Sequence, residues 1–229
     1  MKNLLLASAA AAAVIFGTTG QGMAGDIGSM PSSSAYVSLF GGLAFPGDIH
    51  GNYYGSTAVS IDGDMGFLLG AAIGTHITDS LRGEVELSYA MTDVDDSNFW
   101  DQSFNGPDPA SGDLGVVYLM ANAWYDFNTG SGFTPYIGGG LGAAVLLPDI
   151  TLYTPPGDTL TDTGWGAAGQ LGVGVTWDIT DAAKLDFGYR AKAILSGSLP
   201  GDCSSGRACA IDDVFMVTHI VQVGLTYAF

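Results

Sequence analysis

The feature that most constrains the fold of this chain is an alternation of apolar with polar or small residues, which recurs in eight separate segments. Residues 81–92 show it most clearly, because Leu81, Val85, Leu87 and Tyr89 alternate with Arg, Glu and Ser side chains. A period of two is typical of a β-strand with one apolar and one wetter face. The other segments span 36–45, 65–77, 114–127, 133–147, 165–179, 184–195 and 214–229. The chain is therefore predicted to be all-β.

The connections between these segments are long and short in turn. The long ones span 46–63, 93–113, 148–164 and 196–213, and the short ones span 78–80, 128–132 and 180–183. Short turns at one end and long loops at the other predict antiparallel neighbours in an up-and-down order. One alternative stays open: residues 52–61 could form a hairpin and raise the count from eight strands to ten.

Composition limits where such a sheet can lie. The mean hydropathy is +0.30 and charged residues make up only 13% of the chain. After residue 24, however, no apolar run reaches the roughly 20 residues that a membrane-spanning helix needs. In hydrocarbon every backbone N–H and C=O must be paired within the protein, so a closed barrel is the one all-β solution. We therefore predict an eight-stranded antiparallel up-and-down transmembrane β-barrel.

The first 24 residues have the organisation of a secretory signal peptide. Lys2 precedes an apolar run over 4–16, and small residues lead to Ala24, where we expect the cut. The residue directly after that cut is Gly25 and not a Cys, which argues against a lipid anchor. We predict a signal peptide over 1–24 and a single outer-membrane β-barrel domain over 25–229.

The exported part of the chain is strongly acidic. Without Lys2 it has five Lys and Arg against 23 Asp and Glu. This balance argues against nucleic acid as a partner and against docking onto anionic membrane surfaces. Most of the acidic residues fall in the four long connections, which predicts acidic surface loops.

The end of the last segment carries a recognisable motif. It consists of Gln222, Gly224, Tyr227 and Phe229, a polar residue, a glycine and two aromatic residues. The spacing resembles, at every defined position, the C-terminal β-signal by which outer-membrane proteins are handed to the barrel-assembly machinery. The resemblance implies that this machinery and outer-membrane lipid are partners of the chain.

The strands carry a second, looser resemblance. Residues 74–93, 133–145 and 186–194 are similar to the small outer-membrane β-barrel family that includes OmpA-like, OmpW-like and Opa-like proteins. The resemblance implies the barrel fold and the outer membrane of a Gram-negative bacterium. Members of this porin-family group include membrane anchors, adhesins, surface antigens and narrow channels. The fold therefore does not fix the function.

The polar face of each strand should line the interior, because the face toward hydrocarbon must be apolar. Six charged residues share this interior phase, namely Arg82, Glu84, Glu86, Asp186, Arg190 and Lys192. The third and seventh strands of an eight-stranded barrel lie on opposite walls, so we expect Glu84 and Glu86 to reach toward Arg190 and Lys192. Buried charges persist only when paired, and so narrow an interior is filled by side chains. We favour a charge-paired plug over a gate or ion path.

Aromatic residues in the apolar phase should form girdles at the two membrane boundaries. On the side of the short turns these are Tyr125, Phe127, Trp177, Tyr227 and Phe229. On the side of the long loops they are Phe45, Phe67, Tyr89, Trp165 and Phe215.

Two cysteines, Cys203 and Cys209, lie close together in the last long connection. In an exported protein this spacing predicts a disulfide that closes a small loop. With only two thiols and no nearby His, a zinc site is improbable.

Two acidic runs in the long connections are candidate sites for divalent cations. Asp93, Asp95 and Asp96, or Asp62 and Asp64, could offer oxygen ligands to divalent cations. Neither run has the full spacing of a calcium loop, and a solvated, repulsive surface is the simpler interpretation.

Catalysis is the remaining class of function to consider. Barrel enzymes of the outer membrane use Ser–His or Asp–His sets, and this chain has His50, His76 and His219. Ser204 or Ser205 could approach His219, but no motif places them there. We therefore predict a protein that is not an enzyme and needs no cofactor.

Together these observations predict an outer-membrane barrel with a filled, charge-paired interior and acidic surface loops, in a structural or surface-interaction role. The alternative is a narrow channel, porin-like or OmpW-like, for small or apolar solutes. A surface ligand or host partner is compatible with the loops, but no residue pattern identifies one.

Overall fold

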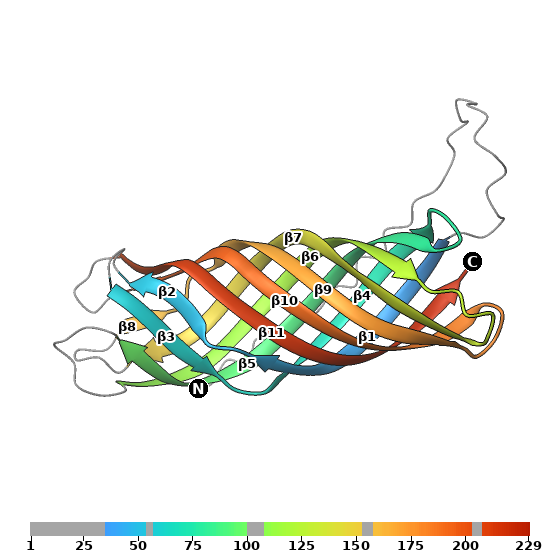
Figure 1. Ribbon diagram of the computed structural model, residues 1–229. Helices are drawn as coiled ribbons and strands as arrows, with labels where there is room; N and C mark the ends of the chain where they lie inside the picture. Colours follow the sequence, from blue (N-terminus) through green and yellow to red (C-terminus); the bar gives the residue numbers. More distant parts are fainter. Residues whose placement is uncertain (1–34, 54–56, 100–107, 153–157, 203–207) are drawn as a thin grey trace, which may run out of the picture. The chain divides into compact units, whose positions relative to one another are not determined.

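The computed structural model describes residues 35–53, 57–99, 108–152, 158–202 and 208–229, so the predicted signal peptide lies outside the described residues. Eleven strands follow one another along these residues, and every pairing between them is antiparallel (Figure 1). They are β1 (Ala35–Pro46), β2 (Ile49–Tyr53), β3 (Thr57–Gly63), β4 (Gly66–His76), β5 (Leu81–Phe99), β6 (Asp108–Asp126), β7 (Phe133–Leu152), β8 (Asp158–Leu160), β9 (Gly164–Asp178), β10 (Ala183–Asp202) and β11 (Ala208–Ala228). Among the described residues, no helix is long and apolar enough to span a membrane.

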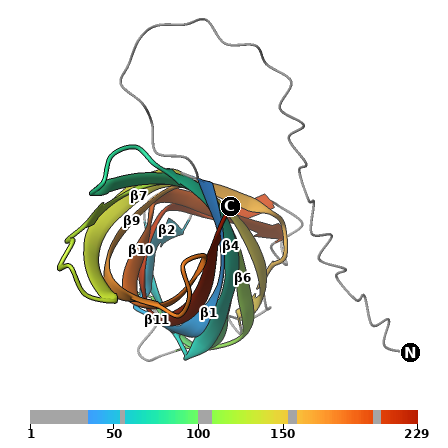
Figure 2. The same cartoon turned by 90° about the vertical axis from the view of Figure 1, so that its right-hand side faces the viewer.

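The strand pairings close a ring through eight of the eleven strands. The order around the ring is β1, β4, β5, β6, β7, β9, β10 and β11, and β11 pairs back onto β1. Figure 2 views this ring from the end at which the C-terminus lies. Each of the eight predicted segments falls on one of these strands. The prediction of an all-β antiparallel fold is confirmed.

The other three strands lengthen the wall at the opposite end. β2 pairs with β11 and β3, β3 pairs with β5, and β8 pairs with β7 and β10. Each follows or precedes a ring strand after a short interruption, so β2 extends β1, β3 extends β4 and β8 extends β9. The hairpin considered within the first long connection therefore exists. It prolongs the wall and adds no strand to the ring.

The short connections use a repeated hydroxyl contact. The Thr78 hydroxyl accepts hydrogen bonds from the backbone N–H groups of Ser80 and Leu81, at 3.3 and 3.0 Å. Thr180 accepts in the same way from Ala182 and Ala183, at 3.3 and 3.0 Å. A threonine at the start of the turn thus satisfies backbone donors that no strand pairs with. These turns and the C-terminus lie at the same end of the ring (Figure 1).

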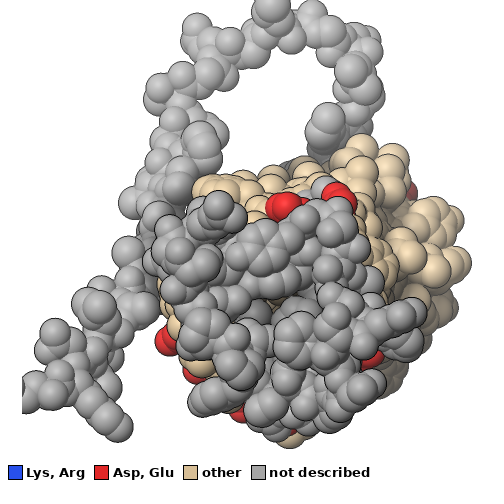
Figure 3. Space-filling model, turned by 90° about the vertical axis from the view of Figure 1, so that its left-hand side faces the viewer, with Lys and Arg blue, Asp and Glu red and all other residues tan. Residues whose placement is uncertain are grey.

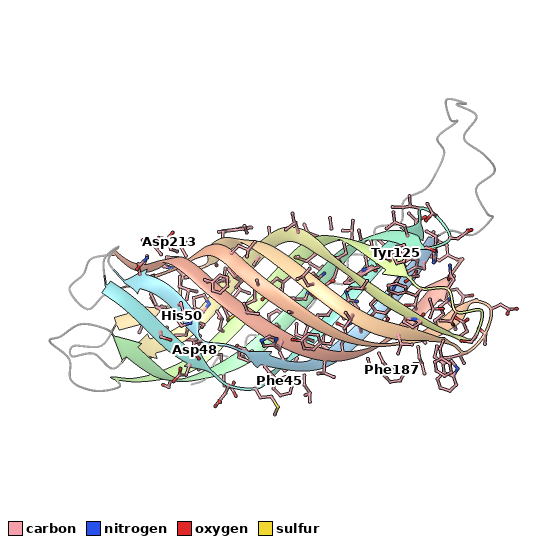
Figure 4. The ribbon with its side chains drawn as sticks, viewed as in Figure 1. Phe45, Asp48, His50, Tyr125, Phe187 and Asp213 are labelled. Carbon is pink, nitrogen blue, oxygen red and sulfur yellow. The ribbon has the colours of Figure 1, made fainter. Side chains whose placement is uncertain are left out.

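The outward face of the ring is apolar over most of its length. The predicted girdle residues Phe45, Trp165, Trp177 and Tyr227 are all exposed there. In Figure 4, Phe45, Tyr125 and Phe187 project away from the ribbon. Large exposed apolar side chains on every strand of the ring indicate a surface made for hydrocarbon.

The interior differs from the prediction in one half. Near the short turns the inward side chains are polar or charged, as expected, but toward the other end they form an apolar core. Its members include Leu68, Tyr118, Met120, Ala144, Leu146, Ile150, Ile194, Leu199, Ile211, Met216 and Ile220. The expectation that polar residues line the whole interior was wrong, because in this half the strands are apolar on both faces. Uninterrupted runs such as Val116–Met120 are the sequence sign of it.

Two bulges carry this apolar interior into the extended wall. Along β10 the inward residues have even numbers up to Ile194 and odd numbers from Gly197, and the register shifts between these two residues. Along β11 the same change falls at Asp213, which has a φ of 54°. A bulge inserts one residue and so exchanges the two faces of a strand. Leu199 and Ile211 thereby point inward next to Leu160 of β8.

Candidate functional site

The charged layer of the interior is organised around Glu86 of β5. Its carboxylate accepts a hydrogen bond and ion pair from Lys192 Nζ at 2.5 Å, and the two side chains are 2% and 1% exposed. Ser88 Oγ, Asn122 Nδ2 and Gln170 Nε2 donate to the same carboxylate at 2.8, 3.0 and 2.9 Å. Lys192 also donates to the Gln170 amide oxygen at 2.9 Å. A buried ion pair with this many hydrogen bonds meets the conditions under which such a pair is tolerated.

A second group lies closer to the short turns. Arg82 pairs with Asp126 of the neighbouring strand at 3.0 Å. Glu84 accepts hydrogen bonds from the Tyr36 hydroxyl at 3.0 Å and from Asn122 Nδ2 at 3.1 Å. Asn122 thus links Glu84 to Glu86, and it joins the two groups into one network.

Arg190 does not make the ion pair that we expected from it. Its guanidinium carbon lies 3.8 Å from the ring centroid of Trp124, and its Nε and Nη1 atoms are buried without a hydrogen-bond partner. Glu86 pairs with Lys192 instead. Trp124 of β6 reaches across the interior into the space beside Gly172. That space exists because a glycine faces inward there, where a Cβ atom would lie 3.1 Å from the ring.

Asp186 completes the set of six predicted charges. It accepts a hydrogen bond from the Tyr136 hydroxyl at 2.9 Å, and Arg82 lies 4.8 Å from the centroid of the same ring. All six predicted residues are therefore in one interior layer. The structure brings together Glu86 with Lys192, and it brings neither Glu84 nor Glu86 into an ion pair with Arg190.

Several side chains outside the six predicted charges also hold this layer together, among them Asp126, which pairs with Arg82. Asn122 and Gln170 are the amides that bridge the charges, Tyr36 donates to Glu84, and Tyr136 donates to Asp186. The sequence does contain a signal for these side chains. Each occupies the interior phase of its strand, and Trp124 alternates there with Asn122 and Asp126.

Two small cavities lie among the described side chains of the interior. A cavity of about 70 Å³ opens among the short turns, where Arg82, Asp126 and Lys184 are among the residues that line it. A second, of about 20 Å³, lies next to Arg190, Glu84 and Asp186. The second volume is close to the least that holds one water molecule. Beyond it the interior is closed by the apolar core, whose members Met120, Leu146 and Ile220 are almost completely buried.

The four residues of the C-terminal motif divide between the two faces of β11. Gln222 and Gly224 point inward, whereas Tyr227 and Phe229 point outward and are exposed. The backbone N–H of Phe229 donates to the carbonyl of Ala35 at 3.0 Å, which joins the end of the chain to the start of β1.

The other candidates of the sequence analysis are separate from the charged layer. Cys203 lies outside the described residues and the side chain of Cys209 is not described, so their disulfide stays a prediction. Among the described side chains, no three His, Cys, Asp or Glu gather as a metal site would require. His219 faces outward and its Nδ1 lies 2.5 Å from the Tyr189 hydroxyl, while Ser204 and Ser205 lie outside the described residues.

A closed ring of antiparallel strands with an apolar outer face, aromatic girdles and a packed interior defines a small membrane β-barrel protein. The comparison with known families agrees: the family described as "Outer membrane protein beta-barrel domain" matches residues 4–229. The chain belongs to this family, and its location is the outer membrane of a Gram-negative bacterium.

Individual proteins show the same relationship. An uncharacterised protein of Brucella abortus (strain 2308) is 29% identical over 192 residues, which cover 70% of this chain and 67% of that protein. The outer membrane protein PagN of Salmonella typhimurium is 30% identical over 125 residues, half of each chain. Among solved structures, Neisserial surface protein A superimposes with a TM-score of 0.52 at 19% identity, over 85% of this chain and 97% of that one. At this identity the likeness concerns the fold.

Proposed function

We propose that the protein is an eight-stranded, up-and-down transmembrane barrel that does not conduct and is not an enzyme, and that it acts by presenting its extended outer wall at the cell surface. The single observation that carries this proposal is the interior, which holds two filled layers in series. A pore would have to cross the hydrogen-bonded layer around Glu86 and then the apolar core around Met120 and Leu146.

The two layers oppose conduction for different physical reasons. Ions that enter the first layer would have to displace the ion pair of Glu86 and Lys192, whose two charges already neutralise each other. Ions that enter the second layer would lose most of their hydration, because the described side chains there are mainly apolar and the few hydroxyls, such as those of Thr92 and Thr218, carry no charge. These arguments favour the plugged barrel over the narrow channel, which stays the alternative that the following experiment decides.

The extended wall supports the surface role. The strands β2, β3 and β8 carry Ile49, Ile61 and Leu160 into the apolar core, so the wall beyond the ring is packed. Its rim is acidic: Figure 3, which views this end, shows Asp and Glu side chains around the edge. Asp93, Asp113 and Asp149 lie in register on the neighbouring strands β5, β6 and β7. A packed acidic surface suits recognition by a basic partner or through divalent cations.

Purified wild-type protein, refolded into planar bilayers, should show no steady single-channel conductance. Arg190→Ala should leave the current at the baseline as well, because the apolar core beyond Arg190 still closes the interior. A steady wild-type current, with an ion selectivity that Arg190→Ala alters, would reject the plug and establish the channel.

The orientation in the membrane can be tested by labelling intact cells, in a background that lacks Cys203 and Cys209. Single cysteines at the long connections should react with a membrane-impermeant thiol reagent, and those at the short turns should not. The first set is Ser56→Cys, Pro107→Cys and Gly157→Cys; the second is Ser80→Cys, Gly130→Cys and Ala182→Cys. The opposite pattern of labelling would show that the extended wall faces the periplasm.

A further inference from the structure

The outer face of the ring carries a marked depression among the described residues. It runs over β7, β9, β10 and β11 and has a volume of about 630 Å³. Its floor is made of the small residues Gly139, Gly169, Ala191 and Ala193, and its sides are formed by Leu141, Leu171, Leu195 and Val217. We call this depression the outer groove. The depression is open to the surroundings of the ring, so it can take one side of a long apolar molecule.

The strand register explains why the surface is hollowed at the outer groove. Gly169 lies directly between Leu141 of β7 and Ala193 of β10, and Leu171 lies between Gly139 and Ala191. Each leucine therefore stands beside small residues that give it no lateral support. Leu141 and Leu171 are accordingly 70% and 72% exposed, more than any other large apolar side chain described on this surface. Such leucines gain contacts only when something lies between them.

A polar pair lies at the β11 margin of the groove, on a face that is otherwise apolar. His219 is two residues from Val217 on the same face of β11, and its Nδ1 is engaged by the Tyr189 hydroxyl at 2.5 Å. The rings of His219 and Tyr189 stack with centroids 6.0 Å apart. His219 Nε2 has no partner among the described residues, so this nitrogen can meet a polar group of a molecule in the groove.

Position along the strands indicates which leaflet the groove faces. Leu171 lies midway along β9 between Trp177, at the short-turn boundary, and Trp165, at the boundary of the extended wall. The groove continues from Leu171 through Gly169 toward Trp165. In the register of β1 with β11, His219 pairs with Phe45, another residue of the girdle at that boundary. The groove therefore occupies the half of the membrane that adjoins the extended wall.

We propose that the outer groove is a binding site for one acyl chain of an outer-leaflet lipid of the lipid A type; the choice of leaflet rests on the proposed placement of the extended wall at the cell surface. The chain lies between Leu141 and Leu171 over the small residues, and its ester, amide or hydroxyl group hydrogen-bonds to His219. The shape favours this occupant over a second barrel. A slender chain can lie against the small residues beside Leu141 and Leu171, whereas a convex barrel wall would rest on these two protruding leucines and leave the small residues uncovered.

The test fills the groove without disturbing the backbone. A Cβ atom on Gly169 would lie 3.5 Å from Leu195 and 3.6 Å from Leu141, which is ordinary contact, so Gly169→Leu should fold. Ala71→Leu is the matched control, since Ala71 is an exposed outward residue on β4, on the opposite side of the ring. The probe is hexa-acylated lipid A, titrated into the full-length mature barrel in detergent and counted per barrel by native mass spectrometry. Heat-modifiable mobility on gels checks the folding of each variant.

Wild type and Ala71→Leu should each retain one lipid A molecule, and Gly169→Leu should bind it at least tenfold more weakly. His219→Phe should weaken binding about three- to tenfold, the value of one hydrogen bond. Equal binding by Gly169→Leu and wild type would overturn the proposal. So would equal retention of phosphatidylethanolamine, which would remove the outer-leaflet assignment, or two-barrel complexes that disappear in Gly169→Leu. If Gly169→Leu does not fold, Ala193→Leu takes its place in the same comparison.

Discussion

Lys192→Met should lower the free energy of unfolding by about 3–5 kcal/mol, because it leaves the Glu86 carboxylate buried without its cation. The remaining donors, Ser88, Asn122 and Gln170, still bind that carboxylate, but they carry no charge to balance it. The change would be measured as a shift of the urea unfolding midpoint of the refolded barrel, followed by tryptophan fluorescence.

The matched control is Lys184→Met. Lys184 pairs with Asp178 at a similar distance, 2.9 Å, but both side chains are more than one-third exposed. Exposed pairs contribute at most about 1 kcal/mol, so this control should shift the midpoint little. The double variant Glu86→Gln with Lys192→Met removes both charges and should recover most of the lost stability. Equal shifts for Lys192→Met and Lys184→Met would show that the buried pair does not hold the interior together.

The fold could be predicted from the sequence because the lipid-facing side of each strand obeys a simple rule. Leu185, Phe187 and Tyr189 alternate with Asp186, Gly188 and Arg190, and only one arrangement keeps the charges away from hydrocarbon. The short turns could also be predicted, because residues 78–80 and 180–183 combine Thr, Asp and Ser or Ala between two alternating segments. The eight strands of the ring follow from these two patterns, whereas β2, β3 and β8 were not among the predicted segments.

The apolar half of the interior could not be predicted in the same way. Around Val116 to Met120 and Val214 to Val217, both phases are apolar, so the period of two disappears. A run of this kind indicates a strand buried on both faces, without showing that one of them is the inside of a barrel. The bulge at Asp213 was also beyond prediction, because a non-glycine residue with positive φ has no reliable sequence sign.

The partners within the charged layer show the limit of register arguments. The opposite walls were assigned correctly, and Glu86 does meet a cation of β10. Which cation it meets depends on the neighbours: Gln170 orients Lys192, and Trp124 covers Arg190 beside Gly172. Those contacts come from β6 and β9, two strands that the pairing of charges alone does not consider. The six charged residues share the interior, and Arg190 stacks on Trp124 instead of pairing with a glutamate.

Phe229→Asp should reduce the amount of protein in the outer membrane at least tenfold, while leaving the stability of the refolded barrel nearly unchanged. The side chain of Phe229 is 60% exposed, and its backbone N–H, which bonds to Ala35, is present in either variant. Surface substitutions of this kind usually change the free energy of unfolding by about 0.5 kcal/mol or less. A large loss in cells would then reflect recognition by the assembly machinery.

Two measurements separate recognition from stability. Membrane fractionation of cells that express Phe229→Asp gives the assembled amount, and urea unfolding of the same variant, refolded in detergent, gives the stability. Tyr125→Asp serves as the control, because Tyr125 is an exposed aromatic residue of the same girdle and lies outside the C-terminal motif. We expect Tyr125→Asp to assemble far better than Phe229→Asp. Normal assembly of Phe229→Asp, or a refolded barrel as unstable as it is scarce, would refute the assignment of Gln222, Gly224, Tyr227 and Phe229 as an assembly signal.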